Sequence, residues 1–245
     1  MTDNWRFAEE SGSFVLPDPH KTSYLYFPLV NEAGMMSAIT PTLNGDIKTG
    51  QNSFLTTPVS IEDLTNSRSA RNFWVHVEGT GAWSATGNSA PQIAQADAER
   101  VTLEAGFLWH KITRESPQID LRAEITNFVP PSDDQAELMR VTLTNITHRP
   151  ITIIPTAAIP IYGRSADNLR DHRHVTSLLH RITTHSYGVL VRPTLSFDER
   201  GHHPNFVTYG VLGVEGDGTP PQSFCPILEE FIGEGGCLEW PDAVV

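Results

Sequence analysis

Residues 118–159 read QIDLRAEITNFVPPSDDQAELMRVTLTNITHRPITIIPTAAI, and their pattern decides the fold class. Apolar and polar residues alternate over Ile119–Thr126 and again over Met139–Thr144. A period of two buries one face of a strand and leaves the other in water, which is typical of a large antiparallel sheet. The chain turns at Pro130–Pro131 and at Asn145–Pro150, and a third strand is predicted to begin at Ile151.

Short runs of β-branched and aromatic residues, bounded by Gly, Pro, Asn and Asp, continue through the rest of the chain. Such runs are typical of strands. We predict strands at Ser23–Val30, Phe73–Glu78, Val101–Trp109, Ile119–Val129, Leu138–Asn145, Ile151–Ile159, Tyr187–Arg192 and Phe206–Val214. Helical patterns are confined to Asn88–Arg100 and Asn168–Ile182. With 18 Gly and 18 Pro among its 245 residues, the chain is predicted to be all-β, a sandwich or barrel.

The composition limits the classes of function. The formal net charge is −12 and no basic stripe is visible, which argues against nucleic acid as a partner. No apolar run approaches the ~18 residues of a membrane span, and the N-terminus lacks the layout of a signal peptide. Cys225 and Cys237 are too few for a disulfide framework. We therefore expect a cytoplasmic protein with reduced thiols and no membrane contact.

The sequence contains no recognisable catalytic set. Nucleophile elbows, P-loops, zinc cysteine pairs and EF-hand loops are absent. In Gly81–Gly87 the serine is not at elbow spacing, and we interpret this segment as a turn closed by a buried tryptophan. The adjacent carboxylates Asp133-Asp134 and Glu229-Glu230 would point to opposite faces of a strand, so neither pair could flank a sugar.

Two regions depart from the strand pattern. Asn31–Arg71 is long and polar, and loops of that length in a compact domain are usually functional or disordered. Its apolar residues favour an ordered loop. Tyr162–His185 is rich in Arg and His, with His172-Arg173-His174 at its centre. These three residues could be metal ligands, a solvated or interface segment, or contacts to an anion or sugar. The arginines argue against a metal, because they would repel a cation.

Several short blocks of the sequence, taken together, resemble segments of a known protein family. They are Phe73–Gly79 with Ala82–Ser84, and Ile125–Pro130 with Leu143–Thr147. These blocks resemble the N-terminal domain of the cellobiose and chitobiose phosphorylases, glycoside hydrolase family ninety-four. The amino-acid sequences of Ser23–Pro28, Thr42–Asp46 and Asp171–Ser177 are most similar to those of the 1,2-β-oligoglucan phosphorylase branch.

The resemblance implies a large antiparallel β-supersandwich of the galactose-mutarotase-like type, with one or two short helices. It also implies reversible, inverting phosphorolysis of β-1,2-glucooligosaccharides to glucose 1-phosphate, with inorganic phosphate as co-substrate and no cofactor. In the family, the catalytic acid and the phosphate site lie on a separate (α/α) barrel C-terminal to the sandwich, so no catalytic residue is carried over. The implied partners are that barrel of the same polypeptide, a β-glucan oligosaccharide and a second copy in a homodimer.

The resemblance gives an expected domain layout. Residues 1–245 would form a single N-terminal supersandwich domain, with a lead-in segment at 1–22. The end of the chain looks like part of a longer protein, and residues 231–245 would begin the connection to the barrel. We interpret Phe231–Gly236 as a strand followed by a turn. The chain alone is predicted to be inactive.

Candidate substrate contacts follow from side-chain chemistry, because amides and carboxylates suit sugar hydroxyls. In the early loop the candidates are Asn44, Asp46, Gln51 and Asn52; in the second region they are Arg170, His172, Arg173 and His174. No catalytic or metal-binding residue is predicted. Two alternatives stay open. One is a stand-alone carbohydrate-binding module whose aromatic platform would use Trp74, Trp83, Trp109 or Trp240, and the other is a mutarotase-like enzyme acting through a His and a Glu.

Overall fold

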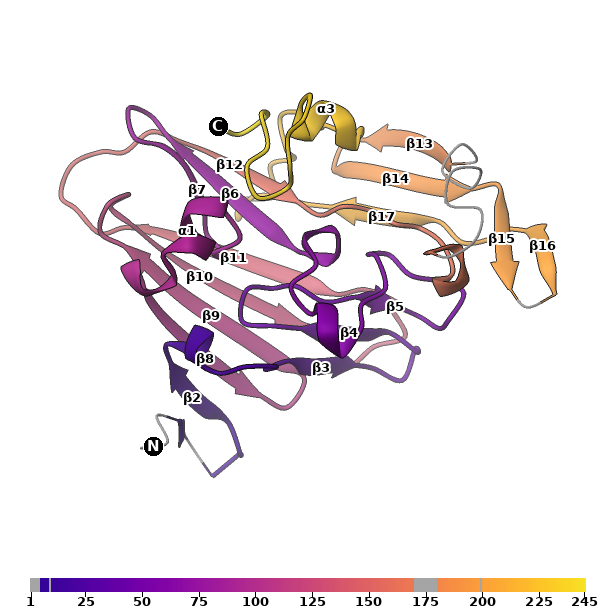
Figure 1. Cartoon of the computed structure of the whole chain (residues 1–245), viewed down its shortest axis with the longest axis horizontal. Helices are drawn as coiled ribbons and strands as arrows, with labels where there is room; N and C mark the ends of the chain where they lie inside the picture. The colour runs from indigo at the N-terminus through magenta and orange to yellow at the C-terminus, as the bar shows by residue number, and fades with distance from the viewer. Residues whose placement is uncertain (1–4, 9, 170–179, 199) are drawn as a thin grey trace.

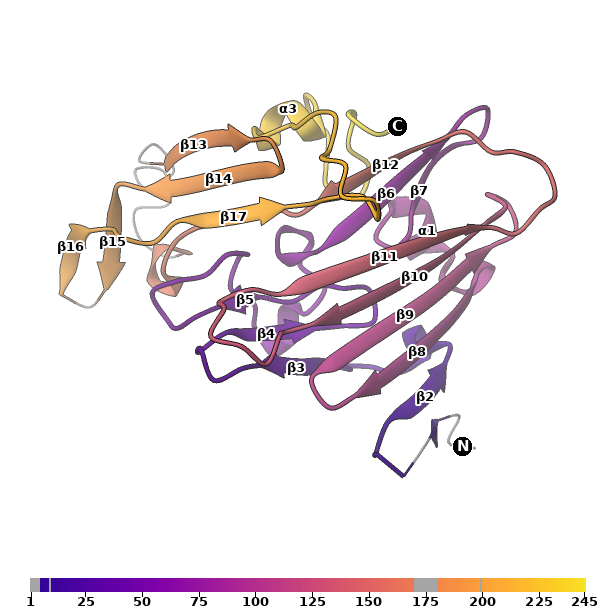
Figure 2. The same cartoon turned by 180° about the vertical axis from the view of Figure 1, so that it is seen from behind.

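The computed structural model describes residues 5–8, 10–169, 180–198 and 200–245. Its largest element is a six-stranded antiparallel sheet (Figures 1 and 2). In spatial order the strands are β1 (Arg6–Phe7), β2 (Phe14–Pro17), β8 (Arg100–Gly106), β9 (Trp109–Ser116), β10 (Leu121–Phe128) and β11 (Leu138–Asn145).

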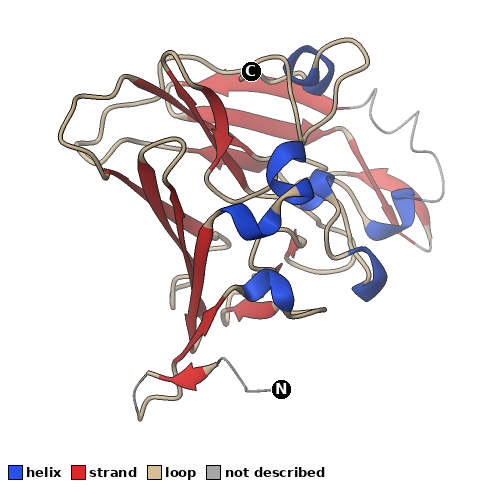
Figure 3. Ribbon diagram, turned by 60° about the vertical axis from the view of Figure 1, so that its left-hand side comes forward, coloured by secondary structure: helices blue, strands red, loops and turns tan. Residues whose placement is uncertain are grey.

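The remaining described strands form four smaller sheets, which Figure 3 shows packed beside and above the large one. Two of them complete the sandwich: β3 (Phe27–Val30), β4 (Met36–Ile39) and β5 (Ile47–Lys48) in one, and β12 (Ile153–Ala158), β6 (Asn72–Val77) and β7 (Gly81–Ser84) in the other. The other two are β13 (His180–His185), β14 (Gly188–Pro193) and β17 (Tyr209–Leu212), and the hairpin β15 (Leu195–Asp198) with β16 (Gly201–Pro204).

Helices are few and short in the described residues. The α-helices are α1 (Ala90–Ala94) and α3 (Leu228–Ile232). The 3-10 turns are η1 (Pro19–Lys21), η2 (Ile61–Asp63), η3 (Ser67–Ser69), η4 (Ala96–Ala98) and η5 (Ala166–Leu169). None of these helices has the length and apolar character needed to cross a membrane. The all-β, antiparallel class with two short helices is confirmed.

The core lies between the six-stranded sheet and the sheets formed by β3–β5 and β6–β7. Leu103, Ile112 and Ile125 are register partners across β8, β9 and β10, and each is fully buried. Side chains opposite each other on neighbouring antiparallel strands share one face and pack together. The alternation predicted for residues 119–126 therefore does point its apolar residues into the core.

Several local predictions were wrong. The strand predicted over Val101–Trp109 is two strands, because Leu108 adopts a left-handed backbone (φ 61°) in the turn between β8 and β9. The strand expected at Phe231 is helix α3. The helix predicted over Asn168–Ile182 is contradicted at its end, where His180–Ile182 belong to strand β13, and residues 170–179 of that prediction lie outside the described residues. The third strand, predicted to begin at Ile151, begins at Ile153 as β12, and it pairs with β6, so the chain changes sheets after Pro150.

The long early loop is ordered, as predicted. It contains β4 and β5, and its apolar side chains Met35, Ile39 and Phe54 are buried. Burial of such side chains removes roughly 1.5–3 kcal/mol of unfavourable hydration each, which fixes the loop against the large sheet. The two cysteines, Cys225 and Cys237, are free thiols on the surface.

Candidate functional site

The two regions that departed from the strand pattern meet in space. Phe54 and Arg164 exchange backbone hydrogen bonds of 2.9 and 3.3 Å, and Tyr162 N donates to Leu55 O at 2.6 Å. Ala166 N donates to the backbone oxygen of Gln51 at 3.0 Å. Residues 48–55 and 162–168, which we call the loop junction, therefore form one surface from segments about a hundred positions apart.

Cation–π contacts hold the side chains of the loop junction. Lys48 Nζ lies 5.0 Å from the ring centre of Phe54, and the guanidinium of Arg164 lies 4.8 Å from that of Tyr162. Tyr162 also donates its hydroxyl to Ser165 O at 3.1 Å. Each cation–π contact stabilises a partly desolvated site by roughly 0.5–2 kcal/mol.

Strands β13 and β17 add His180 and Tyr209 beside Gly163. A β-carbon placed on Gly163 would lie 3.4 Å from the Tyr209 ring and 3.7 Å from His180 Nε2. The packing is therefore close, and the positive φ of Gly163 (63°) also favours glycine there.

Three titratable side chains in and beside the junction, Tyr162, His180 and Tyr209, are held in their neutral forms. Burial lowers the pKa of His180 to about 4, assisted by the Arg164 guanidinium. Burial raises the pKa of Tyr162 to about 12 and also raises the pKa of Tyr209. At pH 7 the imidazole is neutral and both phenols are protonated, so the three can donate or accept hydrogen bonds without carrying charge. That chemistry suits a neutral polyol better than proton transfer.

The early-loop candidates divide into two groups. Asn44 and Asp46 are buried, and Asn44 accepts from Thr42 Oγ1 (2.7 Å) and donates to Asn66 O (3.3 Å). Asp46 accepts from Val59 N at 3.3 Å. Gln51 and Asn52 are exposed at the tip of the loop junction. The structure thus places the second pair on the surface and commits the first pair to internal hydrogen bonds.

The other four candidates, Arg170, His172, Arg173 and His174, lie outside the described residues. The described residues that flank them are Leu169 at the end of η5 and His180 at the start of β13.

Comparison with known families places this site in context. The family model for the supersandwich domain of glycosyl hydrolase 94 matches residues 44–245. The chain belongs to the glycosyl hydrolase 94 family. The match includes the whole loop junction, and a supersandwich domain of this family implies a catalytic partner domain. No curated protein matches the chain.

The four tryptophans considered for an aromatic platform in this glycosyl hydrolase 94 domain differ in burial. Trp74 and Trp83 are 0% and 3% exposed, so neither can stack on a sugar. Trp83 Nε1 donates to Glu99 Oε1 at 2.7 Å, which explains the burial of its polar edge. The burial predicted for the tryptophan of Gly81–Gly87 is confirmed, but Gly81–Ser84 form strand β7 and the turn follows only after Ser84. Trp109 is half-buried and Trp240 is 42% exposed.

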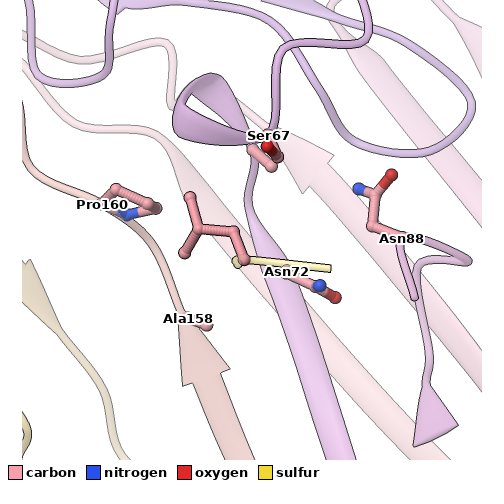
Figure 4. A pocket seen from close by; sticks show the side chains of 7 residues that line it. Ser67, Asn72, Asn88, Ala158 and Pro160 are labelled. Atoms are coloured by element: carbon pink, nitrogen blue, oxygen red, sulfur yellow. The ribbon is translucent and has the colours of Figure 1, made fainter. Parts of the chain in front are cut away.

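A small pocket with a mixed polar and apolar lining lies between η3, β6 and the end of β12 (Figure 4). Ser67, Asn72 and Asn88 project toward it, with Ala158 and Pro160 on the opposite side. Its internal volume is about 10 Å³, room for about one water molecule and not for a sugar ring. The Asn72 oxygen already accepts hydrogen bonds from the hydroxyls of Ser84 and Thr86. This pocket is therefore part of the packing.

A buried ionic centre joins the early loop to the large sheet, and no sequence pattern marked it. Arg71 donates to Glu137 from Nε (2.6 Å) and Nη2 (2.9 Å), and both side chains are almost fully buried. Arg71 also donates to the backbone oxygen of Gly45 at 2.9 Å. Asn127 donates a hydrogen bond to Glu137 at 3.0 Å. His110 on β9 is the register partner of Asn127. The loop that presents the junction is thus anchored by charge-assisted hydrogen bonds.

Proposed function

We propose that this chain is the non-catalytic supersandwich domain of an inverting glycoside phosphorylase acting on β-1,2-glucooligosaccharides. The observation that carries the proposal is the family match over residues 44–245. The linkage rests on the similarity of Ser23–Pro28 and Thr42–Asp46 to the 1,2-β-oligoglucan branch. The exposed free thiols of Cys225 and Cys237 are compatible with the reducing cytoplasm that we assign to it.

In the proposed reaction, inorganic phosphate replaces the attacking water of an inverting glycosidase. A carboxylic acid protonates the leaving glycosidic oxygen while a phosphate oxygen attacks the anomeric carbon from the opposite face. The glycosidic C–O bond breaks, a C–O bond to phosphate forms, and glucose 1-phosphate leaves. We assign the acid to the catalytic partner domain, as the resemblance to the family implies.

The role of this chain is to pack against that catalytic domain, contribute to a homodimer and present the loop junction to a β-glucan oligosaccharide. Exposed apolar side chains on two edge strands support the packing role. Ile154 on β12 is 63% exposed and Leu212 on β17 is 60% exposed. Apolar residues on unpaired edges favour burial against another surface.

Within the loop junction, Gln51 and Asn52 are the proposed sugar contacts. Both are exposed amides, and the turn that carries them is held by the hydrogen bond from Ala166 N to Gln51 O. A fixed backbone lowers the entropy cost of ordering a binding loop. Arg170, His172, Arg173 and His174 are proposed as a second set of contacts from the residues that follow η5.

The test is a phosphorolysis assay with the polypeptide that carries this domain together with its catalytic domain. We expect glucose 1-phosphate release from β-1,2-glucooligosaccharides and much slower release from β-1,4 and β-1,3 isomers. Gln51→Ala and Asn52→Ala should each raise KM several-fold with little change in kcat, because they remove binding contacts and leave the catalytic acid intact. Gln118→Ala, an exposed amide in the β9–β10 turn, is the matched control. A preference for another linkage would refute the proposed specificity.

A further inference from the structure

Two arginines stand directly opposite each other on β13 and β14. Arg181 and Arg192 are register partners, so their side chains lie on the same face of the hairpin, and both are exposed. Their chain neighbours Ile182 and Val191 are also partners, and Val191 is buried on the other face. Like charges placed opposite each other on neighbouring strands destabilise a sheet. In the described part of the chain, no ion pair involves either arginine.

The arginines line a hollow of about 290 Å³. Figures 1 and 2 show the β13–β14 hairpin, whose strand β14 leads into β15. The other described lining residues of the hollow are Pro193, Thr194 and Asn205, so no carboxylate is among them. This local composition contrasts with the formal net charge of −12 for the whole chain. An anion near the protein would therefore be attracted to this hollow and repelled from most of the surface.

Hydrogen bonds and burial hold one wall of the hollow in place. Asn205 is 9% exposed, and its amide donates to Pro193 O (2.8 Å) and Val207 O (2.7 Å). Its oxygen accepts from Val207 N at 3.2 Å, so every polar atom of the amide is occupied. Pro193 is buried beside it and has a ring-fixed backbone. A preformed wall reduces the ordering cost when a ligand binds.

We propose that this hollow binds the phosphate group of a small molecule, inorganic phosphate or a phosphate monoester. Each guanidinium presents parallel N–H donors that match two phosphate oxygens, and two of them at one site neutralise a doubly charged oxyanion. Binding would also remove the repulsion between the two arginines. The volume is close to the lower limit of small-molecule pockets, which fits a sugar phosphate better than a macromolecular surface.

The test uses the 245-residue chain at low ionic strength and titrates it with inorganic phosphate and with glucose 1-phosphate by calorimetry. We expect saturable binding at one site. Arg181→Gln and Arg192→Gln should each weaken binding at least tenfold, and Arg192→Lys should weaken it less, because it keeps the charge and loses the fork. Arg140→Gln on β11 is the matched control, since Arg140 is also exposed and has no ion pair in the described residues. It should stay within twofold of the wild type.

The outcomes separate clearly. Tighter binding of glucose 1-phosphate than of inorganic phosphate would support a sugar-phosphate site, and equal affinities would support recognition of the phosphate group alone. Absence of saturable binding, or affinities that Arg181→Gln and Arg192→Gln leave within twofold, would overturn the proposal. So would binding of a poly-glutamate peptide through these arginines without binding of either phosphate, because it would assign them to a protein contact. Since no step depends on turnover, the result is independent of the proposed phosphorylase activity.

Discussion

Removal of the Glu137 carboxylate should destabilise the domain more than any exposed charge change. Glu137 accepts hydrogen bonds from Arg71 at 2.6 and 2.9 Å and from Asn127 at 3.0 Å, and it also accepts from the Ser37 hydroxyl. The Arg71 and Glu137 side chains are 1% and 5% exposed. In Glu137→Gln the shape is kept, but the Arg71 charge remains buried without a counter-ion.

The magnitude follows from the burial. Breaking a buried ion pair by removing one partner costs about 3–5 kcal/mol. With a urea m value of about 2–3 kcal/mol/M, the unfolding midpoint should fall by about 1–2.5 M. The assay is equilibrium urea unfolding followed by tryptophan fluorescence and circular dichroism. The double variant Arg71→Met, Glu137→Leu should recover much of the loss, because it removes both charges together.

Glu115→Gln provides the matched control. It breaks the pair between Arg100 and Glu115, whose atoms are 3.8 Å apart and whose arginine is 86% exposed. Exposed pairs contribute about 0–1 kcal/mol, so the midpoint should shift by less than 0.5 M. If Glu137→Gln shifts the midpoint no more than Glu115→Gln does, the buried pair does not anchor the early loop and the reasoning fails.

Three further predictions follow from single residues. His110 is buried, and its pKa is lowered to about 3, mainly by burial and also by the charge of Arg71. Because the pKa of histidine in the unfolded chain is near 6.5, the free energy of unfolding should be highest above pH 6.5 and should fall as the pH is lowered toward 3. The expected loss at pH 4 is about 3 kcal/mol. Urea midpoints from pH 7 to pH 4 should fall less steeply in His110→Leu than in the wild type, and parallel curves would contradict the assignment. Gly45→Ala should be severely destabilising, because the new β-carbon would lie 2.1 Å from Ala38 O. In the control Gly34→Ala the β-carbon meets nothing within 4 Å, so the loss should be about 1 kcal/mol. Equal losses of the two variants in thermal unfolding would refute this prediction. Trp74→Ala should cost about 3–5 kcal/mol and Trp240→Ala much less, since the first is 0% and the second 42% exposed, and similar melting temperatures would contradict the packing.

Strands β10 and β11 were predictable from the sequence, whereas β9 was not. β10 follows the alternation because Leu121, Ala123 and Ile125 are buried in the core, and the alternating Met139, Val141 and Leu143 of β11 pack against that core. β9 was not recognised as a strand of its own because its buried row includes His110 and Arg114 besides Ile112. A period-two pattern identifies a buried face only where that face is apolar.

Sheet membership and the buried ionic centre depend on contacts between distant residues. Ile153–Ala158 was recognisable as a strand, but nothing local shows that it pairs with β6. Likewise, Arg71 and Glu137 are separated by 66 positions and resemble ordinary surface charges in the sequence. For the candidate site, the two unusual regions were identified, but their meeting at Phe54 and Arg164 required the structure.

The central claim is that this glycosyl hydrolase 94 domain supports catalysis without performing it. The most direct measurement is glucose 1-phosphate release from β-1,2-glucooligosaccharides and inorganic phosphate. It should be made with the 245-residue chain and, in parallel, with the polypeptide that includes the catalytic domain. The account predicts no release above the buffer control for the chain and sustained release for the longer polypeptide. Turnover by the 245-residue chain alone, abolished when the chain is unfolded, would contradict it.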